Sequence, residues 1–285
     1  MITAETIALV LRQAAVKLSE LPLSDPRLEA EILLAHVLDK PRTHLLAWPE
    51  SRLESAVRDR FRILVERRLN GEPSAYLTGY REFWSLELAV THATLIPRPE
   101  TELLVERALQ LIPPKAIARI ADLGTGSGAV CAAIASERPA CQLLATDNSA
   151  AALAVARGNF RKLGLDQVHC SEGYWCAALP AQPRFDLIVS NPPYVASDDP
   201  HLAEDGLRWE PAGALISGAD GLDDIRQIVA TAADHLQPEG WLLLEHGYDQ
   251  GEQVRKLLND SGYRQCQTWR DLGGRERVSQ GQHPE

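Results

Sequence analysis

The chain has 285 residues, 45% of them hydrophobic, which is enough for a real core and for two domains. Its formal net charge of −10 argues against a surface that neutralises many phosphates, so we expect no direct contact with nucleic acid. Because no apolar run approaches the ~18 residues that span a bilayer, and five cysteines form no C-x-x-C pair, we expect a cytoplasmic protein without membrane contact or a metal site.

The N-terminal region shows only helical periodicity. From Ala4 to Leu18, apolar residues return at the spacing of one helix face. Asp25-Pro26 predicts an N-cap followed by a helix that runs to Leu38. The stretch Ser51-Arg52-Leu53-Glu54 has the spacing of a capping box, which predicts a further helix ending near Leu69.

A strand pattern follows this helical region. Alternation of Trp84, Leu86, Leu88 and Val90 with polar or small residues predicts a β-hairpin that links two domains. The chain then enters Leu95-Ile96-Pro97-Arg98-Pro99-Glu100-Thr101-Glu102, where two prolines enclose an Arg and a helix follows. Within this stiff segment, Arg98 and Glu100 either line a site or form a structural ion pair.

Strands and helices alternate from Ile117 onward, which is typical of a doubly wound parallel sheet. The first strand, Ile117 to Ala121, precedes Asp122-Leu123-Gly124-Thr125-Gly126-Ser127-Gly128 and then a helix from Ala129 to Ser136. Glycines here allow a tight turn and a close approach of a ligand to the helix N-terminus. Because the stretch also fits the dinucleotide-binding pattern, it predicts a nucleoside-containing ligand without choosing the cofactor.

The next two strands also end in polar or aromatic residues. Asp147 follows the second strand, Gln142 to Thr146, and its carboxylate is placed to accept both hydroxyls of a ribose. Alternatively it caps the next helix, a role that Asn148 or Ser149 could also fill. The third strand leads to Tyr174-Trp175, rings that either lie against an adenine or fill the core.

Asn191-Pro192-Pro193-Tyr194 follows the apolar run Phe185 to Ser190 without a spacer. That run predicts a central strand of a parallel sheet, and ligands in such sheets sit at the strands' carboxyl ends. Two prolines stiffen the backbone and remove two N–H donors, so the Asn191 amide and nearby carbonyls can face a ligand. Taken alone, Asn-Pro is also a common turn opener.

The rest of the chain completes the α/β pattern. We expect a helix from about Leu222 to His235, a turn at Gly240, a strand from Trp241 to Glu245, a helix from Gln250 to Asp260, and final strands over about Arg264 to Trp269 and Glu276 to Ser279.

In combination, the glycine stretch, Asp147 and Asn191 to Tyr194 resemble the class I S-adenosylmethionine-dependent methyltransferases that act on planar nitrogen. Within that class, residues 95–102 look like the signature of the HemK/PrmC family, the glutamine-N5 methyltransferases of peptide chain release factors. The resemblance spans nearly the whole chain, including residues 79–84 and Leu244-Glu245-His246-Gly247.

The resemblance implies a Rossmann-like, seven-stranded methyltransferase domain over residues 99–285. It also implies a helical, substrate-docking domain over residues 1–72 and a β-hairpin linker over residues 73–98. The implied reaction transfers a methyl group from S-adenosylmethionine to the amide nitrogen of the glutamine in the Gly-Gly-Gln motif of bacterial release factors one and two.

Site residues carry over from the family by position. The residues implied to contact the cofactor are Gly124, Thr125, Gly126, Ser127, Gly128, Asp147, Trp175 and Asn191, with the glycines at the methionine part, Asp147 at the ribose and Trp175 at the adenine. Those implied to hold the glutamine are Asn191, Pro192, Pro193 and Tyr194. Tyr174 departs from many relatives, which have an acidic residue at that position.

Four other functions remain open at this point. A glutamine methyltransferase of a ribosomal protein shares the catalytic motif, and an N-methyltransferase of a nucleic-acid base handles a similar planar nitrogen. An NAD-dependent oxidoreductase or a non-catalytic nucleotide-binding module would use the glycine stretch and Asp147 but leave Asn191 to Tyr194 unexplained.

Overall fold

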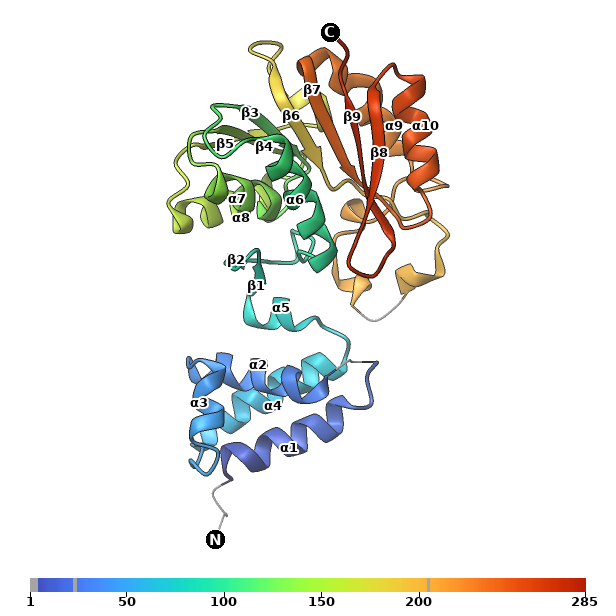
Figure 1. Ribbon diagram of the computed structural model, residues 1–285. Helices are drawn as coiled ribbons and strands as arrows, with labels where there is room; N and C mark the ends of the chain where they lie inside the picture. The colour runs from blue at the N-terminus through green and yellow to red at the C-terminus, as the bar shows by residue number, and fades with distance from the viewer. Residues whose placement is uncertain (1–4, 23–24, 204–205) are drawn as a thin grey trace. The chain divides into compact units, whose positions relative to one another are not determined.

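The computed structural model describes residues 5–22, 25–203 and 206–285, and these residues form two compact units (Figure 1). The described residues up to Gly79, together with residues 206–209, form a helical unit. Residues 80–203 and 210–285 form an α/β unit. The expected fold class is confirmed, whereas the functional division at residues 72 and 98 stays a prediction.

Among the described residues, five α-helices and the short helical turn Leu207–Trp209 make up the helical unit. The α-helices are α1 (Ile7–Leu18), α2 (Pro26–Leu38), α3 (Arg42–Ala47), α4 (Ser55–Leu69) and α5 (Ser74–Thr78). The apolar face expected on the first helix is buried, although Ala4 lies outside the described residues. The helix predicted after Asp25 is also confirmed, because the Asp25 side chain accepts hydrogen bonds from the N–H groups of Arg27 and Leu28, both at 3.0 Å.

The predicted capping box is wrong. Helix α4 starts at Ser55 after the N-cap Glu54, and no side chain caps it. The backbone of Ser51 is used elsewhere, since its carbonyl accepts a hydrogen bond from the N–H of Ile7 at 3.0 Å. Leu53 likewise donates to the carbonyl of Glu5, so extended pairing with the start of α1 holds this segment.

The predicted hairpin opens the α/β unit. Strands β1 (Tyr80–Phe83) and β2 (Leu86–Ala89) pair in antiparallel fashion. Trp84, expected in a strand, lies in the turn with Ser85, and both residues have positive φ angles, 52° and 58°. This left-handed pair matches the twist of the two flanking strands.

A seven-stranded mixed sheet forms the centre of the α/β unit, in the order β5-β4-β3-β6-β7-β9-β8. The strands are β3 (Arg119–Leu123), β4 (Gln142–Asp147), β5 (Val168–Glu172), β6 (Phe185–Ser190), β7 (Leu236–Glu245), β8 (Arg264–Arg270) and β9 (Glu276–Gln282). Strands β3 to β7 form a group in which all neighbouring strands are parallel. Strand β9 is antiparallel to both β7 and β8.

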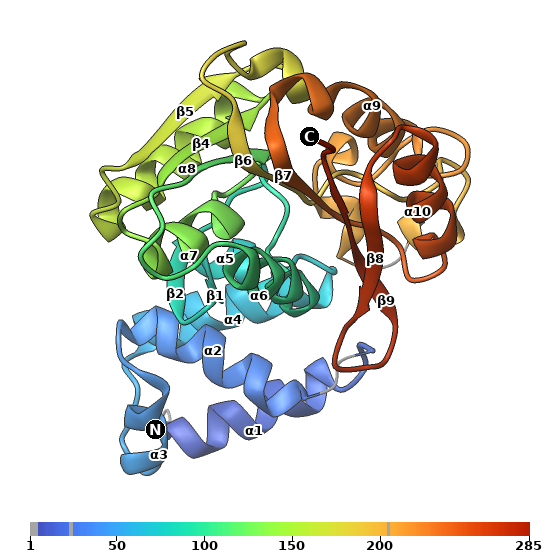
Figure 2. The same ribbon diagram turned by 45° about the horizontal axis from the view of Figure 1, so that its top comes forward.

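Helices cover both faces of this sheet. They are α6 (Glu102–Leu111), α7 (Ala129–Glu137), α8 (Ala150–Leu163), α9 (Asp223–Ala232) and α10 (Gly251–Asp260). The first three pack in one core cluster with Ile120 and Leu187, and the last two pack in another with Ala121 and Ile188 (Figures 1 and 2). Successive strand residues therefore face opposite layers, and the central strands are buried on both sides.

The turn expected at Gly240 is also wrong, because β7 begins at Leu236 and continues through Gly240. The pairing with β6 jumps from Leu236 to Trp241, so the intervening residues form an irregularity within the strand. A Cβ at Gly240 would lie 2.9 Å from the carbonyl oxygen of Gln237. Glycine is thus needed there for a close backbone approach inside a strand.

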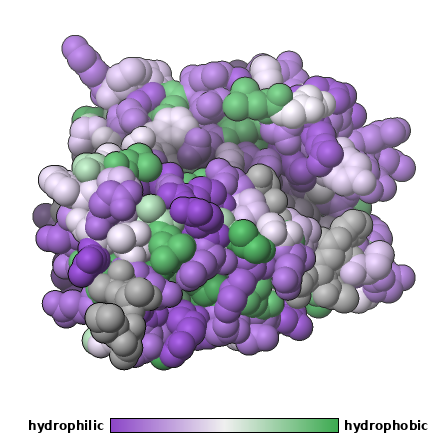
Figure 3. All heavy atoms as spheres, turned by 90° about the horizontal axis from the view of Figure 1, so that it is seen from below, coloured by the Kyte–Doolittle hydropathy of each residue, from purple (hydrophilic) through white to green (hydrophobic). Residues whose placement is uncertain are grey.

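Within the described ranges, no helix combines the length and the apolar character needed to cross a membrane. On the face drawn in Figure 3, apolar residues are scattered between hydrophilic ones.

Asn159 of α8 ties the hairpin to the loop after β3. Its Nδ2 donates to the carbonyl of Ala89 at 3.0 Å and to the carbonyl of Ser127 at 2.8 Å, while its Oδ1 accepts from the N–H of Ala89 at 2.8 Å. The side chain is almost fully buried, so these bonds replace water. A single side chain thereby fixes the end of the loop Gly124 to Gly128, which we call the glycine loop.

We predict that Asn159→Ala lowers the free energy of unfolding by about 2–4 kcal/mol, because three backbone groups lose their partner in a buried place. Urea denaturation measures the effect. The matched control is Asn259→Ala on α10, where an exposed side chain makes one bond to the carbonyl of Arg255 and where we expect less than about 0.5 kcal/mol. Equal losses in the two variants would contradict this role.

Candidate functional site

Three neighbouring parallel strands end side by side at one edge of the sheet. Leu123 of β3 pairs with Thr146 of β4 and with Ser190 of β6. The residues that follow these strands, including the glycine loop, therefore gather at the same edge. A cavity of about 420 Å³ lies there.

Most of the predicted site residues line this cavity. Those that do are Gly124, Thr125, Gly126, Ser127, Asp147, Trp175, Asn191 and Pro193. Gly128, Pro192 and Tyr194 are not among the lining residues. The Tyr194 hydroxyl instead donates to Glu245 Oε1 at 3.2 Å.

The glycine loop needs glycine for two different contacts. Gly124 has a φ of 69°, and a Cβ there would lie 2.9 Å from the Trp175 ring. Gly128 has a φ of 84°, and its Cβ would lie 2.6 Å from the Phe160 ring of α8. Both the left-handed backbone and the aromatic neighbours therefore exclude side chains.

Asp147 organises the loop through its carboxylate. Its Oδ2 accepts from the N–H of Gly126 and its Oδ1 from the N–H of Ser149, both at 2.9 Å. The N-cap of α8 is Ser149, whose hydroxyl oxygen accepts from the N–H of Ala152. Since each carboxylate oxygen has two lone pairs, Asp147 keeps acceptor capacity toward the cavity that it lines.

A second carboxylate holds the aromatic wall of the cavity. Asp224, in the first turn of α9, accepts from Trp175 Nε1 at 3.0 Å and from the Tyr174 hydroxyl at 2.8 Å through the same oxygen. Asp224 lines the cavity as well. Nothing local in Leu222-Asp223-Asp224 distinguishes a ring partner from an ordinary acidic helix start, so the sequence does not predict this role of Asp224.

Asn191 has a fixed partner at the wall of the cavity. Its Nδ2 donates to Thr101 Oγ1 at 3.2 Å. Thr101 ends the short helical turn Pro99–Thr101 that precedes α6, and it lines the cavity too. Because this bond uses the amide nitrogen, Oδ1 is the atom of Asn191 that is left to accept a bond from a ligand.

The open question about Arg98 is answered by an ion pair. Arg98 binds the carboxylate of Glu210, a side chain that is 2% exposed and also accepts from the N–H of Ile96 at 3.3 Å. Burial is the main cause that raises the pKa of Glu210, and Arg98 opposes it. The pair fastens residues 95–101 to the segment after Glu210, whose Pro211 lines the cavity.

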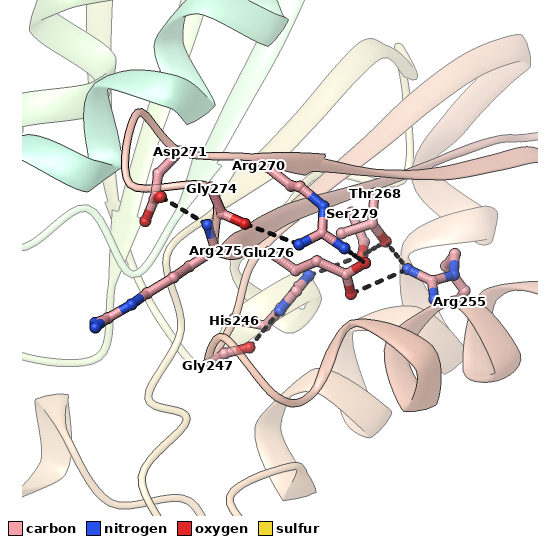
Figure 4. A network of polar contacts seen from close by, with 10 residues as sticks. All are labelled: His246, Gly247, Arg255, Thr268, Arg270, Asp271, Gly274, Arg275, Glu276 and Ser279. Atoms are coloured by element: carbon pink, nitrogen blue, oxygen red, sulfur yellow. Dashed lines mark hydrogen bonds and ion pairs between the residues drawn. The ribbon is translucent and has the colours of Figure 1, made fainter.

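A polar network holds the end of β7 in the same unit (Figure 4). Buried His246 contacts the carbonyl of Gly247 through Nδ1 and the Ser279 hydroxyl through Nε2, both at 2.8 Å. Since a carbonyl only accepts, Nδ1 carries a proton, and burial lowers the pKa of the ring so that Nε2 accepts from Ser279. Ser279 also bonds to Thr268, which accepts from Arg255.

Asp122, the last polar group of β3, lies under the glycine loop. Its Oδ2 accepts from Thr125 Oγ1 at 2.6 Å, and burial raises its pKa to about 7, although the Thr125 bond lowers it. Within the part of the chain that the structure describes, no group of three or more His, Cys, Asp or Glu residues could hold a metal ion.

We predict a pH-dependent contribution of Asp122 to stability. Its folded pKa lies above the unfolded value of 3.8, so the folded state binds the proton more tightly between pH 4 and about 7. The free energy of unfolding of the wild type minus that of Asp122→Asn should therefore fall, by up to about 4 kcal/mol, as pH rises through this window. Urea denaturation at several pH values measures this difference, and a pH-independent difference would contradict the prediction.

Comparisons with known proteins agree with this geometry. The PrmC N-terminal domain family matches residues 10–79, and the methyltransferase small domain family matches residues 99–205. The release factor glutamine methyltransferase of Xylella fastidiosa is 54% identical over 90% of this chain and 94% of its own length. The enzyme of the same name from Pseudomonas aeruginosa is 51% identical over 94% of this chain and 96% of its own.

A solved methyltransferase from Pyrococcus furiosus shares the fold, with a TM-score of 0.52 and 17% identity over 70% of this chain and 90% of that one. The Xylella and Pseudomonas enzymes match this chain at about one residue in two, and the matches extend over nearly the whole chain. The chain therefore belongs to the release factor glutamine methyltransferase family.

Proposed function

We propose that this chain transfers a methyl group from S-adenosylmethionine to the side-chain amide nitrogen, N5, of the glutamine in the Gly-Gly-Gln motif of bacterial release factors one and two. One observation carries the proposal: Asn191, with its nitrogen bound to Thr101, borders a cavity that the glycine loop and Asp147 also line. The names of the relatives support the choice of substrate.

The cavity suits the proposed cofactor in size and chemistry. Its volume of about 420 Å³ lies in the usual range for small-molecule sites. We assign Gly124, Thr125, Gly126 and Ser127 to the methionine part, Asp147 to the ribose hydroxyls and Trp175 to the adenine side. Gly128 does not line the cavity and serves the same loop by packing closely on Phe160. When bound, S-adenosylmethionine supplies a methyl group attached to a positively charged sulfonium.

The residues after β6 prepare the substrate nitrogen. An amide nitrogen is a poor nucleophile, because its lone pair is delocalised into the carbonyl. Asn191 Oδ1 faces the cavity, whereas Pro192 does not line it and would have to present its carbonyl once the glutamine binds. If the two oxygens each accept one N–H, the lone pair points at the methyl group, and the pyramidal transition state is favoured. Held in this way, the nitrogen would take up the methyl group that the bound cofactor supplies and would release one proton to water.

The residues Asn191 to Tyr194 form a tip at the end of β6, and Pro193 and Tyr194 shape the part of it that follows Pro192. Pro193 lines the cavity, whereas the Tyr194 carbonyl accepts from Gln250 Nε2 at 3.0 Å and its hydroxyl binds Glu245. These two bonds support Tyr194 as an anchor of the tip from behind. Packing of Tyr194 on the substrate amide remains a prediction of the family resemblance.

The substrate and the place of the reaction follow from the same proposal. We assign the helical unit to docking of the release factor, and we place the reaction in the cytoplasm, where release factors act. A ribosomal-protein glutamine or a nucleic-acid base would use the same tip, so both enter the test as alternative substrates. The net charge of −10 favours a protein substrate over nucleic acid.

We predict that incubation with a bacterial release factor and S-adenosylmethionine adds one methyl group to the Gln of Gly-Gly-Gln, as seen by peptide mass spectrometry. Asn191→Ala should lower the rate by about 100-fold or more, because one acceptor for the transition state is lost. Asn259→Ala, on the exposed face of α10, serves as the matched control and should keep the wild-type rate.

Transfer to a ribosomal protein or nucleic acid, with no methyl group on Gly-Gly-Gln, would contradict the proposed substrate and leave the assigned fold unchanged. A near-normal rate for Asn191→Ala would overturn the role of the tip.

We further predict that Asp147→Asn weakens binding of S-adenosylmethionine by about 10-fold, since an amide offers one acceptor oxygen where the carboxylate offers two charged ones. Isothermal titration calorimetry measures the dissociation constant. Asp166→Asn removes the same charge from an exposed loop and should leave it unchanged. Equal affinities for the wild type and Asp147→Asn would remove Asp147 from the binding site.

A further inference from the structure

Three acids are the charged residues that line the cavity, within the part of the chain that the structure describes. Asp147 already has a place in the proposed function, and Asp122 is engaged by the Thr125 hydroxyl under the glycine loop. The third acid is Asp224, in the first turn of α9, which holds two rings but has no assigned contact with the cofactor. The bonds of its carboxylate show which contact it is able to make.

The two oxygens of Asp224 differ in what they bind. Oδ1 accepts from Trp175 Nε1 at 3.0 Å and from the Tyr174 hydroxyl at 2.8 Å, which occupies both of its lone pairs. Burial raises the pKa of Tyr174, and the bond to Asp224 adds to this effect, so the hydroxyl keeps its proton and donates it. Among the described residues, none donates a hydrogen bond to Oδ2. This oxygen therefore keeps its full capacity to accept.

The order of groups along the sheet edge places Asp224 next to the base of the cofactor. Strands β4 and β5 are parallel neighbours, and beyond their ends the N–H of Gly173 donates to the Asp147 carbonyl at 3.0 Å. Tyr174 and Trp175 follow Gly173 directly, so they come next to the position assigned to the ribose. A base attached to this ribose is thus brought to the two rings and to the carboxylate of Asp224 that holds them.

The Trp175 ring also shows which end of the base meets Asp224. A Cβ at Gly124 would lie 2.9 Å from this ring, so the indole reaches from the glycine loop to Asp224. The glycine loop is assigned to the methionine part, and Asp224 therefore marks the opposite end of the wall. In adenine the exocyclic amine at C6 lies on the six-membered ring, away from the bond to the ribose. The amine and the free oxygen of Asp224 thus belong to the same end of the cavity.

We propose that Asp224 selects adenine as the base of the cofactor, with Oδ2 accepting an N–H of the exocyclic amine while Oδ1 holds Trp175 and Tyr174. The inference rests on the proposed function, in which Trp175 flanks the adenine. A base with a carbonyl at C6, as in hypoxanthine, places a second acceptor against the charged oxygen. Two acceptors with no proton between them repel each other, so this base is disfavoured.

The variant Asp224→Asn reverses this preference, because its neighbour determines which way the new amide lies. Trp175 Nε1 is only a donor, so the amide oxygen must take the place of Oδ1. The amide nitrogen then takes the place of Oδ2 and faces the base as a donor. The variant therefore offers a hydrogen bond to a carbonyl at C6 and opposes an amine there.

The test measures the dissociation constants of S-adenosylhomocysteine and S-inosylhomocysteine by isothermal titration calorimetry. We expect the wild type to bind the adenine compound at least about 50-fold more tightly. In Asp224→Asn, the affinity for the adenine compound should fall about 10-fold and that for the inosine compound should rise about 5-fold. The rise is the decisive readout, because the loss of a merely structural carboxylate weakens both ligands.

Two controls isolate this contact. A homocysteine compound whose purine carries hydrogen at C6 offers neither donor nor acceptor there, so its affinities for the wild type and Asp224→Asn should agree within about 3-fold. Asp223→Asn removes the same charge from the exposed neighbouring residue, which does not line the cavity, and should leave all dissociation constants unchanged. With saturating S-adenosylmethionine, kcat of Asp224→Asn for a release factor should stay within about 3-fold of the wild type, because the contact lies away from the methyl group.

Equal affinities of the wild type for the adenine and inosine compounds would overturn the inference, whatever the variant does. Weaker binding of both compounds by Asp224→Asn would also overturn it, because the carboxylate would then only hold the rings. Failure of the proposed function is distinguishable, since in that case the wild type binds neither S-adenosylhomocysteine nor S-adenosylmethionine.

Discussion

The structure depends on the register of β3 between its two parallel neighbours. Leu123 pairs with Thr146 on one side and Ser190 on the other, and the Ser190 hydroxyl donates to the Leu123 carbonyl at 2.7 Å inside the core. Because parallel strands end at a common edge, this register places the glycine loop, Asp147 and Asn191 around one cavity. A shift by one residue would reverse every side chain on these strands and disperse the site.

Buried acids give the site its second property, a fixed direction for its hydrogen bonds. Asp122 and Glu245 both lie in the core, and burial raises the pKa of each to about 7. A charged acid accepts from the hydroxyl beside it, that of Thr125 for Asp122 and that of Tyr194 for Glu245. Each hydroxyl is then left to present only its oxygen to other groups. Orientation set in this way costs no rearrangement when the substrate arrives.

The sequence predicted best where the signal is local. Asp25 before Pro26 marks a helix start, and the apolar run from Phe185 to Ser190 coincides with β6. The glycine loop and Asp147 were found because strand, turn and helix follow one another within a few residues. The capping-box spacing at Ser51 failed, because its backbone pairs with the start of α1, a partner that the local pattern does not contain.

Contacts between distant segments were the part that the sequence could not provide. Asn191 meets Thr101 across 90 residues, Ala89 meets Asn159 across 70, and Trp175 meets Asp224 across 49. Arg98, Glu100 and Thr101 lie in the same proline-bounded stretch. Nothing in their spacing indicates that Thr101 is the one of the three that lines the cavity. Only the packing of α6, α8 and α9 on the sheet brings these partners together.

The most direct measurement is a crystal structure of the protein with S-adenosylhomocysteine and a peptide that contains Gly-Gly-Gln. The account predicts the nucleoside against Asp147 and Trp175, and the glutamine amide nitrogen about 3 Å from Asn191 Oδ1 while Nδ2 still contacts Thr101. A glutamine bound away from Asn191, or an Asn191 that offers its nitrogen to the substrate, would contradict the account.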